Sequence, residues 1–143
     1  MDTGVKFEII WSDDDLVEVR VHASNGRFAG TVDCYGGHDE IPRIIEAVRG
    51  FPTSSEDRRE LEIGTFDPDF AGGGARLVLR CADAAGHAVA DVTVRADPCG
   101  NGWPAETASF SVPVEPAAID EFVVALGSMS SVVGTIASLR QAT

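Results

Sequence analysis

One segment of the chain, residues 39–51 (DEIPRIIEAVRGF), has the periodicity of an amphipathic helix, and the sequence on both sides of it alternates as β-strands do. Its apolar side chains fall at i, i+3, i+4 and i+7, as Ile41, Ile44, Ile45 and Val48. Asp39 suits the N-cap, Pro42 the first turn and Gly50 the stop. A helix with one apolar stripe has to cover another apolar surface, so we expect this helix to cover a β-sheet.

Seven segments alternate between apolar and polar residues with period two, which predicts β-strands. These strands are expected at residues 6–11, 16–23, 27–35, 59–64, 75–82, 88–96 and 107–114. In the first strand the alternation places Phe7, Ile9 and Trp11 on one face. Asn25-Gly26 predicts a two-residue hairpin of type I′, which requires positive φ at both central positions.

The C-terminal third of the chain carries a second helical pattern. A helix is expected to begin near Ala117, directly after Pro116, with an apolar stripe made of Ile119, Phe122, Val123 and Leu126. Gly127-Ser128 interrupts this pattern. The apolar residues of 129–139 then continue at helical spacing and predict a third short helix, although Gly134 disfavours it. Residues 128–143 are therefore expected to form a peripheral helix or a tail.

The order of these elements, β-β-β-α-β-β-β-β-α, predicts an α+β protein. Short turns between strands with one apolar and one polar face indicate antiparallel neighbours. We expect a two-layer sandwich, with a mainly antiparallel sheet of six or seven strands and two or three helices packed on one face. The 143 residues are expected to form a single domain, residues 1–143.

The formal net charge of −12 disfavours a nucleic-acid-binding role, because no basic patch opposes it. An acidic surface instead favours a cationic protein partner through electrostatic steering. No apolar run approaches the ~20 residues needed to span a bilayer, so we expect no membrane partner. The N-terminal residues lack the pattern of a secretion signal, and the odd number of cysteines disfavours a disulfide framework. A cytoplasmic protein fits these features.

Several short motifs resemble those of a group of small, acidic, uncharacterised bacterial proteins. The similarity lies in the segments Arg27–Val32 (RFAGTV), Phe51-Pro52 after the helix, Leu61–Gly64 (LEIG), Leu77–Arg80 (LVLR) and Asp83–His87 (DAAGH). Some proteins of this group are similar to immunity proteins, which neutralise a toxin. The resemblance implies an immunity-type binding role and implies no catalytic residues.

Few residues are spaced as catalytic or metal-binding groups are, and we expect no catalytic residue and no cofactor. The pair Asp67 and Asp69 is the better metal candidate, although Asp-Pro-Asp is also ordinary turn chemistry. The Asp13–Asp15 run lacks the remaining residues of a calcium loop, and Gly72–Gly74 lacks the GK[ST] ending of a phosphate loop.

Cysteine and histidine give only weak candidates for nucleophilic chemistry. Cys34 and His38 can be paired as nucleophile and base, with Asp39 as orienting group, but the alternation places Cys34 inward. Cys99, in a loop, is the cysteine expected to be most exposed.

The outward sheet face is the preferred candidate for a binding surface, because mixed charge on a broad sheet can dock a partner specifically. Its predicted contact residues are Glu18, Arg20, His22, Asp33, Arg80, Asp91, Arg95 and Trp103. Trp11 or Trp103 at the border of this face would favour the prediction, because an exposed tryptophan is an interface anchor. The sequence thus predicts a non-enzymatic protein-binding module of the immunity type. Two alternatives remain open. One is a small-molecule binder or small enzyme with its site between loops 65–74 and 97–104, and the other is a homodimer formed through residues 129–139.

Overall fold

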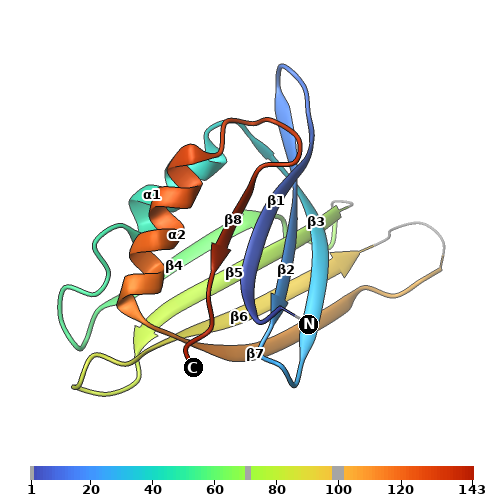
Figure 1. The fold of residues 1–143 in the computed structure, drawn as a ribbon. Coiled ribbons are helices and arrows are strands. Elements are labelled where there is room, and N and C mark those ends of the chain that lie inside the picture. The colour runs from blue at the N-terminus through green and yellow to red at the C-terminus, as the bar shows by residue number, and fades with distance from the viewer. Residues whose placement is uncertain (1, 70–71, 98–101) are drawn as a thin grey trace.

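The computed structural model describes residues 2–69, 72–97 and 102–143, which form two antiparallel sheets of four strands and two helices (Figure 1). Sheet A has the order β3-β2-β1-β8, and its strands are β1 (Gly4–Ser12), β2 (Leu16–Ser24), β3 (Ala29–Gly37) and β8 (Ile136–Leu139). Sheet B has the order β4-β5-β6-β7, and its strands are β4 (Arg58–Gly64), β5 (Gly72–Cys81), β6 (Ala88–Asp97) and β7 (Glu106–Val114). The α+β class and all seven predicted strands are thereby confirmed.

The two helices lie side by side between β8 of sheet A and β4 of sheet B (Figure 1). Helix α1 (Glu40–Val48) follows β3, and helix α2 (Pro116–Ser128) follows β7. Each turns its predicted apolar stripe inward, so that Ile44 of α1 and Phe122 of α2 are buried. Asp39 occupies the N-cap position of α1, but its carboxylate pairs with Arg43 instead of bonding to the backbone. Neither described helix has the length and apolar character required to cross a membrane.

One hydrophobic core fills the space enclosed by the two sheets and the helices. The ring of Phe7 on β1 meets the ring of Phe122 on α2 edge to face, with centroids 5.6 Å apart. Buried leucine and valine side chains of β5 and β6 form the opposite wall, including Leu77 and Val92. Both sheets and both helices therefore contribute buried side chains to one shared core.

The prediction of a single sheet of six or seven strands is wrong, because the strands form two separate sheets of four. Strand β3 crosses sheet B in close contact but forms no strand pairing with it. Glycines make this crossing possible. A Cβ atom at Gly73 of β5 would collide with the Val32 side chain and lie 2.8 Å from the Asp33 carbonyl oxygen of β3. A Cβ atom at Gly30 of β3 would lie 2.5 Å from Val94 of β6. The run Gly72–Gly74 therefore opens β5, and Gly73 within it permits close contact with β3.

The predicted third helix over residues 129–139 is also wrong. Residues 136–139 form β8, which pairs antiparallel with residues 5–8 of β1. Gly134, with φ of 95°, directs the chain into this pairing, and the Gly134 amide donates to the Ile9 carbonyl. The β-branched residues of this segment favour a strand once the free edge of β1 offers a partner.

The β-hairpin between β2 and β3 differs from the predicted type I′ turn. The Asn25 amide donates to the Phe28 carbonyl, so that the two central residues are Gly26 and Arg27. Among these two, Gly26 alone has positive φ, at 88°. This is the pattern of a type II′ turn, in which glycine stands at the first central position.

Candidate partner-binding surface

The outer face of sheet A points away from the core and presents three rows of side chains that follow from the strand register. The first row contains Ser138, Lys6, His22 and Thr31. The second row contains Ile136, Glu8, Arg20 and Asp33. The third row contains Trp11, Glu18 and Tyr35. We call this set the outer face.

The middle of the outer face is ordered by side-chain hydrogen bonds between neighbouring strands. Arg20 donates from Nε and Nη2 to the two carboxylate oxygens of Asp33, over 2.8 and 3.1 Å. His22 Nδ1 lies 2.7 Å from the Thr31 hydroxyl oxygen. A hollow of about 840 Å³ opens beside these residues, and its lining includes Lys6, the one lysine of the chain. Cross-strand pairs of this kind fix side chains in place and give the surface a defined shape.

Trp11 reaches the outer face because of a β-bulge in β1. Ile9 pairs with Val19, but Trp11 pairs with Glu18, so that Ile10 is an extra residue. The extra residue reverses the alternation, so the prediction that Trp11 shares a face with Phe7 and Ile9 is wrong. The Trp11 ring packs edge-on against Tyr35 on β3, with ring centroids 6.4 Å apart. A bulge that turns a large aromatic side chain out of the core is typical of a functional surface.

Tyr35 also interacts with the carboxylate of Glu18, its neighbour on β2. The negative charge of Glu18, and a hydrogen bond between the phenol and this carboxylate, raise the pKa of Tyr35. The phenol therefore stays protonated and can donate to Glu18.

Next to Tyr35 the surface forms a hollow of about 350 Å³ at the crossing of β3 with sheet B. Glycines 72 and 73 form part of its lining. The charged and aromatic side chains that line it are Glu18, Asp33, Tyr35, Asp97, Trp103 and Glu106. We call this feature the aromatic hollow. Trp103 Nε1 donates to Glu106 Oε1 over 3.1 Å, so the two aromatic residues of the hollow each interact with a carboxylate.

The sequence placed eight contact residues on one surface, and the structure divides them between the two sheets and the segment before β7 that carries Trp103. Glu18, Asp33 and Trp103 line the aromatic hollow, and Arg20 and His22 lie on the adjoining rows of the outer face. The remaining three residues, Arg80, Asp91 and Arg95, are on sheet B.

These three sheet B residues differ in their relation to the hollow. Arg95 pairs with Asp97 at 3.2 Å and so adjoins the hollow. Arg80 pairs with Asp91 at 2.7 Å, and Asp91 also accepts a hydrogen bond from the Ser111 hydroxyl. Arg80 and Asp91 do not line the hollow, so the predicted continuous surface is corrected to the outer face of sheet A together with the hollow.

Sequence reasoning missed two residues of this surface, Tyr35 and Glu106, and it placed Trp11 on the same face as Phe7 and Ile9. The bulge hid Trp11, because no local pattern marks a single extra residue in a strand. The alternation Thr31, Asp33, Tyr35 did place Tyr35 outward, and this signal was present in the sequence. Nothing in the sequence connects Glu106 with Trp103 in particular.

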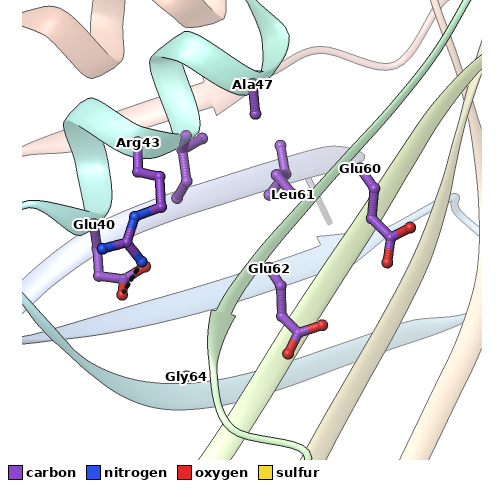
Figure 2. A pocket seen from close by; sticks show the side chains of 8 residues that line it. Glu40, Arg43, Ala47, Glu60, Leu61, Glu62 and Gly64 are labelled. Carbon is purple, nitrogen blue, oxygen red and sulfur yellow. Dashed lines mark hydrogen bonds and ion pairs between the residues drawn. The ribbon is translucent and has the colours of Figure 1, made fainter.

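A separate hollow of about 340 Å³ lies between α1 and the edge strand β4 (Figure 2). The ion pair of Glu40 with Arg43 borders it on the helix side. Figure 2 shows the side chains of Glu60 and Glu62 pointing away from the helix, and both pair with Arg76. We do not take it as the binding surface, because its lining includes no aromatic side chain and its carboxylates are paired with arginine.

The predicted metal and nucleophile candidates gain no support. Asp67 accepts a hydrogen bond from the Asp69 amide, as in an ordinary turn. The described residues contain no group of three or more side chains placed to hold a metal ion.

Burial raises the pKa of Cys34 to about 12, so its thiol is not a nucleophile at neutral pH. The two ring nitrogens of His38 lie within hydrogen-bond distance of the Asp13 carbonyl and the Ser131 hydroxyl, and neither has a hydrogen bond to Cys34 among the described residues. The prediction for Cys99 lies outside the described residues.

Comparison of the chain with family models, with curated proteins and with solved structures found no match. The functional argument therefore rests on the residues of the outer face and the aromatic hollow.

Proposed function

We propose that the protein is a non-enzymatic binding module that engages another protein through the outer face of sheet A and the adjoining aromatic hollow. One observation carries the proposal. Both tryptophans and the single tyrosine of the chain lie in this region and are solvent-exposed, at 42% for Trp11, 51% for Tyr35 and 64% for Trp103. Tryptophan and tyrosine are the side chains most enriched among energetically important interface contacts. Phe7 and Phe122, by contrast, are buried in the core.

The charge of the region supports a cationic partner. Four carboxylates line the aromatic hollow, and the whole chain has a net charge of −12. Long-range attraction raises the association rate of an oppositely charged protein and weakens as salt screens it. The proposed partner is therefore a protein with a basic surface that approaches the acidic side of this module.

An affinity capture from lysate of the source cells tests this proposal with matched variants. Trp11→Ser and Trp103→Ser each remove an exposed aromatic ring, while Val124→Ser removes an exposed aliphatic side chain of α2, which is 71% exposed. We expect wild type and Val124→Ser to retain the same stoichiometric partner, and both tryptophan variants to lose it. Equal capture by all four proteins would contradict the proposal.

We further propose an immunity-type role, which the resemblance of the sequence motifs supports. Under this proposal the captured partner is a protein that stops growth when it is expressed alone. Co-expression of wild type is expected to restore growth, and co-expression of a variant lacking both tryptophan rings is not. A partner without toxicity would remove the immunity role and leave the binding role intact.

Two alternative functions are each supported by one observation. The aromatic hollow lies between the segments predicted for a small-molecule or enzymatic site, since Gly72, Asp97 and Trp103 all line it. A homodimer is supported by the exposure of Val132, Val133 and Ile136, at 49% or more. Sedimentation of wild type and of a Val132→Ser/Val133→Ser variant tests the dimer, because self-association through this segment predicts a dimer only in wild type.

A further inference from the structure

We infer that the aromatic hollow binds a single arginine side chain of the partner protein. This inference rests on the proposed binding function and names the chemical group that the hollow recognises. It is argued from the unequal pairing of the carboxylates, from the position of the rings, and from two sites where the same chain binds its own arginine in the same manner.

The four carboxylates of the hollow fall into two classes. Asp33 has Arg20 as its partner at 2.8 Å, and Asp97 has Arg95 at 3.2 Å. Glu18 and Glu106 form no ion pair within the described parts of the chain, and their partners are the aromatic donors Tyr35 and Trp103. A hydrogen bond from a phenol or an indole leaves the negative charge of the carboxylate in place. The hollow therefore contains two carboxylates that form no ion pair with a described cation, although the charge of Arg20 acts on Glu18 from the neighbouring row.

The same two carboxylates hold the rings that line the hollow. The hydrogen bond from Trp103 Nε1 to Glu106 restrains the indole, and the interaction of Tyr35 with Glu18 restrains the phenol. The negative potential above an aromatic face attracts a cation within about 6 Å of the ring centre. An aromatic ring beside an unpaired carboxylate is thus a site for a group that is both flat and positively charged.

The protein contains this combination twice with the arginine already in place. The Arg76 guanidinium lies 4.5 Å from the centroid of the Phe66 ring and donates to Glu62 at 2.9 Å. Arg59 lies 6.0 Å from the centroid of the Phe51 ring and donates two hydrogen bonds to Asp57. In each case a ring and at least one carboxylate hold the guanidinium, and Arg76 also pairs with Glu60 at 3.4 Å.

The aromatic hollow places a ring beside a carboxylate as these two sites do, with Trp103 beside Glu106 and Tyr35 beside Glu18. Arginine suits the hollow better than lysine does, because its planar group can stack on a ring and donate to a carboxylate at the same time. A partner arginine inserted here would complete the arrangement that Arg76 and Arg59 complete within the chain.

Titration with three short peptides tests the inference. The peptides are acetyl-Gly-Gly-X-Gly-Gly-amide with arginine, lysine or citrulline at X, and citrulline keeps the shape of arginine without its charge. The indole N–H signals of Trp103 and Trp11 in ¹H–¹⁵N spectra report binding. We expect a saturable shift of the Trp103 signal with the arginine peptide, binding at least threefold weaker with lysine, and binding at least tenfold weaker with citrulline.

Charge-removing variants locate the binding. The double variant Glu18→Gln/Glu106→Gln is expected to weaken binding of the arginine peptide at least tenfold. Glu46→Gln removes a carboxylate on α1 that is 73% exposed, and it is expected to leave binding within twofold of wild type. Equal binding of the citrulline or lysine peptide, no saturable shift, or equal losses in both variants would overturn the inference.

Titration with agmatine distinguishes two possible occupants of the hollow, a free small molecule and an arginine side chain of a protein. Agmatine carries a guanidinium without a peptide backbone. Binding of agmatine more tightly than the arginine peptide would assign the hollow to a small molecule and overturn the side-chain assignment. The inference can also fail by itself. A partner that is lost from Trp11→Ser but kept by Glu18→Gln/Glu106→Gln would preserve the binding function and remove the arginine site.

Discussion

The ring of Trp11 packs edge-on against the ring of Tyr35, with centroids 6.4 Å apart and an angle of 76° between the ring planes. This contact exists because Ile10 is an extra residue in β1 and turns Trp11 from the core to the outer face of sheet A. The strand keeps Phe7 and Ile9 fully buried on one side of the bulge, and it presents an exposed indole on the other side. The bulge thus places Trp11 outside the core, where it forms an aromatic pair with Tyr35 on the surface.

Replacement of Trp11 is expected to have little effect on stability. Trp11→Ser should change the free energy of unfolding by less than about 1 kcal/mol, because the ring is 42% exposed and lies outside the core. Phe7→Ala, in the same strand, should cost about 3–5 kcal/mol because Phe7 is fully buried. Urea denaturation of both variants measures the difference. A cost for Trp11→Ser as large as that for Phe7→Ala would show that Trp11 is a core residue.

Two glycine-to-alanine substitutions should have opposite effects on stability, because Gly73 lies where β3 crosses sheet B and Gly127 lies in open space on α2. Gly73→Ala places a methyl group against Val32 and the Asp33 carbonyl, and it should destabilise the protein by roughly 1–3 kcal/mol. Gly127→Ala, on α2, meets nothing within 4 Å and should stabilise the protein by about 0.5–1 kcal/mol. Thermal and urea denaturation give both values. A neutral Gly73→Ala variant would mean that the two sheets are not in close contact there.

The lowered pKa of Asp57 predicts that the folded protein loses stability as the pH falls. Hydrogen bonds from Arg59, and then from the Thr53 backbone, lower the pKa of Asp57 to about 2. Because the folded-state pKa lies below the unfolded value, the stabilisation is present above about pH 4 and is lost as the pH falls through 2.

Asp57→Asn tests this expectation in urea denaturation at pH 7, 4, 3 and 2. The variant should be less stable than wild type by roughly 1–2 kcal/mol at pH 7, and the gap should close as the pH falls toward 2. A gap that is the same at every pH would exclude the Asp57 charge as its cause.

Cys34 is expected to resist thiol reagents in the folded protein. Burial is the main cause that raises its pKa to about 12, so the reactive thiolate is scarce at pH 8. Peptide mapping after treatment with iodoacetamide should find Cys34 unmodified without denaturant and fully modified in urea. Rapid modification of Cys34 in the folded protein would contradict its burial and reopen a nucleophilic role.

Local sequence patterns were sufficient for most secondary structure but not for its assembly into sheets. The stripe of Ile41, Ile44 and Val48 predicted α1 correctly, because a helical face is defined within a few residues. The segment that became β8 was wrongly predicted as helix, since its strand form depends on the free edge of β1, more than a hundred residues earlier. The division into two sheets depends on glycine contacts between distant strands, as at Gly73, which no local period reports.

The residues of the candidate surface could be predicted only in strands whose apolar and polar residues alternate without a bulge. Glu18, Arg20 and Asp33 were correctly placed together on one outward face, because β2 and β3 alternate without interruption. Trp11 was misplaced by the bulge. Arg80 and Asp91 were joined to the same face only because the sequence did not show that their strands belong to a second sheet.

The most direct test of the account is calorimetric titration of the captured partner into wild type, Trp11→Ser, Trp103→Ser and Arg80→Gln. Arg80 lies on the outer side of sheet B and serves as the control. We predict that each tryptophan variant binds at least tenfold more weakly, equivalent to about 1.4 kcal/mol or more, and that Arg80→Gln stays within twofold of wild type. Loss of binding in Arg80→Gln with both tryptophan variants unaffected would contradict the account and move the binding surface to sheet B.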